Sequence, residues 1–177
     1  MFRRRFLGVG LMLAGFSRRA WAQPASASQG FSPLTHPVKI PLESVATPWH
    51  TVPFVAEAVT PADGDKPGRR VVLNGVLFRK AAGEGASALS ALCVTCPHEQ
   101  CQVDIVTDET RLAKMTKGAA QNPLFQCGCH FSVFDAMDDG AWISGVAYRG
   151  LFQFRVGSVS DGTVQINEVE EEALSVV

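Results

Sequence analysis

Hydrophobic and polar residues alternate along several short stretches of this chain, and a two-residue period is typical of strands with one buried face. The alternation is clearest at residues 151–156 and 164–167, which are separated by an Asp161-Gly162 turn signal. Residues 88–94 are apolar except for Ser90, and this composition indicates a buried strand. No long stretch beyond the basic N-terminus has a 3.6-residue period, so the pattern predicts an all-β protein of stacked antiparallel sheets.

A hairpin turn is predicted near the middle of the chain. Asn74-Gly75 lies between the apolar runs 71–73 and 76–78, and this dipeptide suits the two positive φ angles of a type I′ turn. Upstream, several prolines leave room only for short edge strands near residues 38–40 and 52–58, because proline cannot donate a hydrogen bond within a central strand.

The N-terminus has the composition of a targeting segment. Residues 3–7 read Arg-Arg-Arg-Phe-Leu, similar to a twin-arginine export signal, and Ala20-Trp21-Ala22 offers a small-x-small cleavage site. The apolar stretch 6–16 would rise about 17 Å as a helix, well short of the roughly 30 Å hydrocarbon core of a bilayer. We therefore expect residues 1–22 to be a cleaved signal and the protein to be periplasmic, where it can contact a membrane but does not span it. The alternative is that these residues form a basic helix lying on a membrane surface.

Two segments near the middle of the chain combine cysteine with histidine. Residues 96–101 read Cys-Pro-His-Glu-Gln-Cys, and residues 127–135 read Cys-Gly-Cys-His-Phe-Ser-Val-Phe-Asp. Two thiolates on one iron and two imidazoles on the other hold a Rieske [2Fe–2S] centre. The paired segments resemble the Rieske family over about residues 89–156, which implies a Rieske-like all-β fold with a two-loop cluster-binding subdomain.

The resemblance also implies which residues hold one [2Fe–2S] cluster. The expected ligands are Cys96, His98, Cys127 and His130. High-potential members of the family carry a disulfide at the positions of Cys101 and Cys129, and an oxidising compartment would favour that bond; two free thiols are the alternative.

Three further residues match positions that tune the family's cluster. Ser132 corresponds to a serine whose hydroxyl donates to a bridging sulfide and raises the potential, whereas Phe134 replaces a tyrosine of quinol-oxidising relatives. Gly145 begins a segment, residues 145–148, that stands in place of their proline-rich loop. The resemblance therefore implies an intermediate to high potential and weighs against quinol docking.

The composition of residues 23–37, which are rich in Pro, Ala, Ser and Gln, and the family resemblance together set the expected domain limits. A flexible leader at 23–37 precedes a Rieske domain at 38–170, whose cluster-binding part covers about 93–150, and a tail follows at 171–177. The segment between the two cluster-binding sequences is longer than is usual in the family, and the extra residues fall in 107–123. Two interpretations of this insertion remain open: a partner-docking flap beside the cluster, or a solvated loop.

Charge and family resemblance together suggest the partners. Five of the 16 basic residues lie in the first 22 positions, so the remainder has 11 basic and 17 acidic residues. Such a balance argues against nucleic-acid binding and is compatible with a basic redox partner. The Cys-His-Phe-Ser sequence at residues 129–132 resembles the small subunit of arsenite oxidase. This resemblance implies that the protein transfers single electrons from a larger catalytic subunit to a cytochrome c or similar acceptor. It also implies that the protein performs no substrate chemistry of its own.

Two alternatives stay open at this point. One is the Rieske subunit of a quinol–cytochrome c reductase. The other is a small exported β domain stabilised by structural zinc, for which four thiolates are available: Cys93, Cys96, Cys127 and Cys129.

Overall fold

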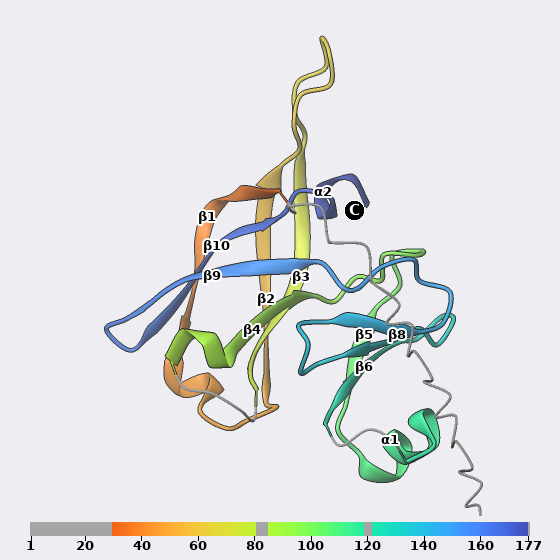
Figure 1. Cartoon of the computed structure of the whole chain (residues 1–177). Coiled ribbons are helices and arrows are strands. Elements are labelled where there is room, and N and C mark those ends of the chain that lie inside the picture. The colour runs from red at the N-terminus through yellow and green to blue at the C-terminus, as the bar shows by residue number, and fades with distance from the viewer. Residues whose placement is uncertain (1–29, 81–84, 119–121, 177) are drawn as a thin grey trace, which may run out of the picture.

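The computed structural model describes residues 30–80, 85–118 and 122–176, and their architecture is all-β, as the hydrophobic pattern predicts. Six antiparallel strands close into a barrel beside a second, four-stranded sheet (Figure 1). The predicted export signal at 1–22 lies outside the described residues. Around the barrel the order is β1 (Phe31–Pro41), β10 (Thr163–Glu170), β9 (Gln153–Ser160), β4 (Leu89–Cys93), β3 (Arg70–Arg79) and β2 (Thr51–Val59).

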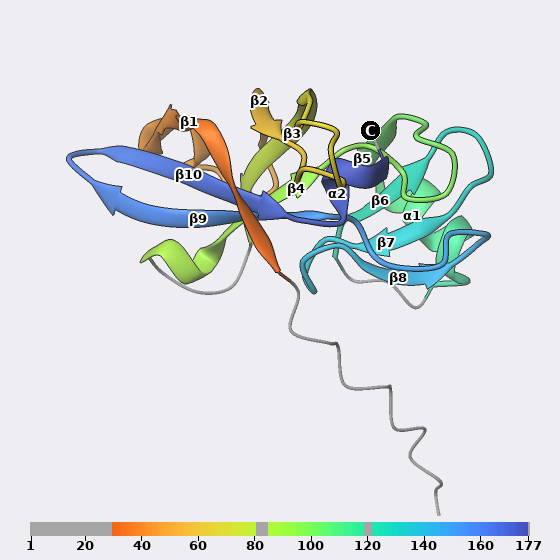
Figure 2. The same cartoon turned by 90° about the horizontal axis from the view of Figure 1, so that it is seen from above.

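The second sheet is an insertion into the barrel. Its strands follow chain order: β5 (Val103–Val106), β6 (Leu124–Cys127), β7 (Val133–Asp135) and β8 (Ala141–Ser144). The chain leaves the barrel after β4 and returns at β9, and these two strands are neighbours in the barrel. The inserted sheet therefore lies beside the barrel at the point where both of its connections leave (Figure 2).

Strands predicted from strong local patterns are present. All five residues of β4 are buried, as expected for the apolar run. Strands β9 and β10 form a hairpin whose turn residues, Asp161 and Gly162, have φ angles of 50° and 69°. Their positive φ angles are those a type I′ turn requires.

The predicted hairpin at Asn74-Gly75 is wrong. Both residues lie within β3, which pairs without interruption with β2. The glycine serves packing instead: an added Cβ would lie 2.4 Å from Cζ of Phe54 and 2.8 Å from Cε2 of Phe154. The reversal between β2 and β3 comes instead within residues 60–69.

The leader and tail predictions also need correction. β1 begins at Phe31, inside the segment 23–37 expected to be flexible, and pairs with β10. It also pairs with β2 at Leu34, so the expected edge strands belong to a closed barrel, which has no edges. At the other end, the short helix α2 (Ala173–Val176) has a buried Leu174 and packs on the barrel core rather than forming a free tail.

The insertion at residues 107–123 contains a helix, α1 (Glu109–Thr116). Asp108 caps it by accepting a hydrogen bond from the Arg111 amide, and Leu112 is buried against the second sheet. The segment that contains α1 connects the end of β5 to the start of β6, and these two strands are antiparallel. It therefore lies at the opposite end of the second sheet from the 127–132 loop, which follows the end of β6 (Figure 1). The segment is therefore neither a flap beside the predicted site nor wholly a solvated loop.

The remaining helical elements are single turns, η1 (Leu42–Val45) and η2 (Gly85–Ala88). In the described part of the chain, no helix has the length and apolar character needed to cross a membrane.

Candidate metal centre

Two loops of similar backbone geometry form one end of the second sheet. In loop 96–101 the Cys96 amide donates to the Cys101 carbonyl at 2.9 Å, and in loop 127–132 the first amide donates to the Ser132 carbonyl, also at 2.9 Å. The fifth residue of each loop is left-handed, with φ angles of 59° and 57°. Each loop thus folds back on itself.

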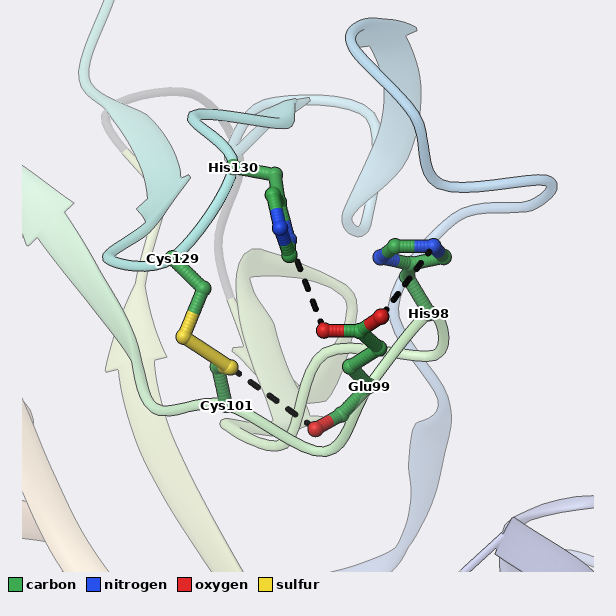
Figure 3. Close-up of a disulfide and its surroundings, with 5 residues drawn as sticks. All are labelled: His98, Glu99, Cys101, Cys129 and His130. Carbon is green, nitrogen blue, oxygen red and sulfur yellow. Dashed lines mark hydrogen bonds and ion pairs between the residues drawn. A yellow bond between two sulfur atoms is a disulfide. The ribbon is translucent and has the colours of Figure 1, made fainter.

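A disulfide between Cys101 and Cys129 joins the two loops, as the family resemblance implies (Figure 3). It links positions 28 residues apart. The bond holds the first His-bearing loop beside the second independently of any bound group.

Two free thiols lie on the inner side of these loops. Cys96 and Cys127 are each 1% exposed and share an apolar cluster with Phe125 and Phe134. Burial raises the pKa of the Cys96 thiol, the amide of His98 opposes this increase, and the neighbouring Cys127 thiol adds to it. A metal would supply the positive charge that favours the thiolate form of Cys96.

Two imidazoles lie on the outer side. The rings of His98 and His130 meet edge to face with centroids 5.1 Å apart, and their side chains are 31% and 45% exposed. The loops therefore provide two sulfur donors from the interior and two nitrogen donors at the surface, and this donor set fits a [2Fe–2S] cluster with one sulfur-bound and one nitrogen-bound iron.

Glu99 is a member of the site that the sequence pattern did not identify. Its carboxylate lies between the imidazoles, with oxygens 4.0 Å from Nε2 of His98 and 3.7 Å from Nδ1 of His130 (Figure 3). Ligand atoms of these three residues lie within 4.8 Å of one another. The sequence did place Glu99 between two cysteines of the first loop. Its position along the chain did not, however, predict that the side chain would point toward the histidines.

The three predicted tuning residues lie against the loops. Ser132 is fully buried, and its Oγ accepts a hydrogen bond from the Ala147 amide at 3.0 Å, which leaves the hydroxyl proton for another acceptor. Gly145 has a φ of 98°, and an added Cβ would lie 2.5 Å from Cα of Ser132, so only glycine fits this approach. Phe134 is fully buried and places a ring without a polar atom in the apolar cluster.

The alternative four-thiolate zinc site is not formed. Cys129 is bonded to Cys101 and so has no thiolate to offer. Cys93 belongs to the barrel core, whereas Cys96 and Cys127 belong to the core of the second sheet. The described residues therefore do not assemble the sulfur ligands that this reading requires.

Comparison with known proteins yields similarities to solved structures alone. No protein-family model matches the chain, and no curated protein matches it. Among solved structures, the soluble domain of the Rieske protein II from Sulfolobus acidocaldarius is 18% identical, with 80% of this chain and 68% of that chain covered and a TM-score of 0.36. At this level of similarity, any assignment of the site depends on its own residues.

Proposed function

We propose that this protein transfers single electrons through a Rieske-type [2Fe–2S] cluster. The observation that carries the proposal is the arrangement of donors on two disulfide-joined loops, with paired thiols inside and paired imidazoles outside. The proposed ligands are Cys96, His98, Cys127 and His130.

Each part of the site has a role in this proposal. The cluster, when bound, accepts and releases one electron at a potential set by its ligands and surroundings. Phe125 and Phe134 exclude water from the thiol side, and the Ser132 hydroxyl is placed to donate a hydrogen bond into the site. The exposed edges of His98 and His130 give the shortest way for an electron to leave the protein.

We further propose an exported subunit similar to the small subunit of arsenite oxidase, passing electrons from a larger catalytic subunit to a cytochrome c or similar acceptor. Phe134 and the 145–148 segment, both unlike quinol-oxidising relatives, favour this reading over a quinol–cytochrome c reductase subunit. The protein itself performs no substrate chemistry in this scheme.

EPR of the dithionite-reduced protein, with iron, sulfide and zinc measured on the same sample, tests the proposal. We expect a rhombic Rieske spectrum and about two irons per chain. Cys96→Ala should abolish the signal, whereas Cys93→Ala, which removes a buried thiol from the barrel core, should keep it. Bound zinc without a reducible cluster would overturn the proposed function.

A further inference from the structure

The exposed tip of the proposed centre carries one carboxylate. Three segments form this tip, residues 96–101, 127–132 and 144–148, and Glu99 is their single acidic residue, with neither lysine nor arginine among them. Its side chain is 59% exposed. Among the side chains of the tip that are not proposed cluster ligands, Glu99 is therefore the single charged one.

Two basic side chains beside the second sheet are engaged elsewhere. Lys80 pairs with Asp139 at 2.8 Å, and Arg149 pairs with Glu170 and Glu172 on the barrel side. Among the described residues, the recorded ion-pair contacts of Glu99 are those with the two histidines. The carboxylate is thus available to a cation that comes from outside the molecule.

Large apolar side chains accompany this carboxylate. Phe131, directly after His130, is 67% exposed, and Val146 and Tyr148 are 54% and 68% exposed. The latter two flank Ala147, whose amide is bonded to Ser132 of the second loop, so they lie at the same end of the molecule. Exposed apolar groups gathered around one polar group are typical of a docking surface.

We infer that Glu99 makes this tip selective for a redox partner that presents an ammonium or guanidinium group within an apolar surface. The inference rests on the proposed function, because the tip matters only if electrons leave there. Charge complementarity across a contact increases the association rate and makes it salt-dependent. A partner with an anionic face would meet Glu99 as a like charge and be disfavoured.

Electron transfer to two small oxidants of opposite charge tests this selectivity. Tris(phenanthroline)cobalt(III) is a cation with apolar faces, and hexacyanoferrate(III) is a polar anion. In each reaction the reduced protein loses one electron, which converts Co(III) to Co(II) or Fe(III) to Fe(II) in the oxidant. The measured quantity is the ratio of the two second-order rate constants, because a change in the protein's own potential affects both reactions in the same direction.

Glu99→Gln should lower the cobalt-to-hexacyanoferrate ratio at least about threefold at low salt, and the difference should shrink at high salt. The matched control is Asp161→Asn, which removes the same charge from the β9–β10 turn, distant from the second sheet (Figure 1). An unchanged ratio in Glu99→Gln, or an equal fall in both variants, would overturn the inference.

EPR on the same samples separates this inference from the proposed function. A variant that has a normal Rieske spectrum and an unaltered ratio contradicts only the role of Glu99. If the unsubstituted protein contains no reducible cluster, this result contradicts the proposed function itself.

Discussion

At Gly75 the backbone of β3 passes closest to two aromatic rings of the barrel core. Phe54 and Phe154 pack edge to face, with centroids 5.0 Å apart, and both are more than nine-tenths buried. A Cβ on residue 75 would approach both rings to less than 3.0 Å. Since protein cores are close-packed, neither ring can move without disturbing its own neighbours.

We therefore expect Gly75→Ala to lower the free energy of unfolding by about 2 kcal/mol, the cost of overpacking a core. Urea unfolding measures this loss. Shortening the opposing side chain with Phe54→Leu should make the same glycine substitution cheaper, so the double variant should be more stable than the sum of the single effects. Additive effects would show that the rings do not oppose the new methyl group.

The same residue shows why some sequence signals mislead. Asn-Gly favours a tight turn through local backbone preference, and here contact with rings from β2 and β9 overrides that preference. The two segments that carry cysteine and histidine were expected to come together because metal chemistry requires those residue types at short spacing, and the structure joins them through the Cys101–Cys129 disulfide. Glu99 was not, since its direction depends on how loop 96–101 folds against loop 127–132.

At the scale of elements, the disulfide closes a loop that contains two strands and a helix. The chain between Cys101 and Cys129 includes β5, α1 and β6, and the two bonded residues are 28 positions apart. Closing a loop of this length restricts the unfolded chain, which by the chain-entropy estimate stabilises the fold by about 3 to 4 kcal/mol.

Replacing Cys101 and Cys129 together by serine should therefore lower the free energy of unfolding by about 3 kcal/mol in denaturant titration. Adding a thiol reductant to the unsubstituted protein should produce a similar loss. The same reductant should leave the double serine variant unaffected. A variant as stable as the oxidised protein would show that the two loops are held mainly by their other contacts.

Elements differ in how far the sequence reveals them. β4, β9 and β10 were predicted because each carries its own apolar pattern. β1 was predicted too short, because its N-terminal half is stabilised mainly by pairing with β10, the far end of the sequence. α1 was missed although Asp108 is a good N-cap residue, since eight residues are too few for a clear helical period.

At the scale of the whole molecule, one buried ion pair joins the second sheet to the barrel. Arg149, in the connection that follows β8, pairs with Glu170 at the end of β10 and lies over the ring of Phe152 at 4.3 Å. The Glu170 side chain is 2% exposed. Burial raises the pKa of this carboxyl above its ordinary value, although the Arg149 guanidinium acts in the opposite direction.

This shift makes stability depend on pH in a defined direction. Between the ordinary pKa of a glutamate, about 4.3, and the raised pKa of Glu170, the folded protein retains a proton that the unfolded chain has lost. The stabilising contribution of that proton is complete below the ordinary value and is lost as the pH rises through the raised one. Glu170→Gln cannot titrate and removes this dependence.

We therefore expect the free energy of unfolding of the unsubstituted protein, minus that of Glu170→Gln, to decrease as the pH is raised from about 4 through the raised pKa of Glu170. Urea titrations of both proteins across this range give the difference, in which the contributions of other carboxyl groups largely cancel. Glu171→Gln removes the same charge at an exposed neighbouring position. The free energy of unfolding of this control variant should change with pH in the same way as that of the unsubstituted protein. A constant difference for Glu170→Gln would mean that Arg149 fully offsets the burial of the carboxylate, so that the joint between barrel and second sheet does not respond to pH.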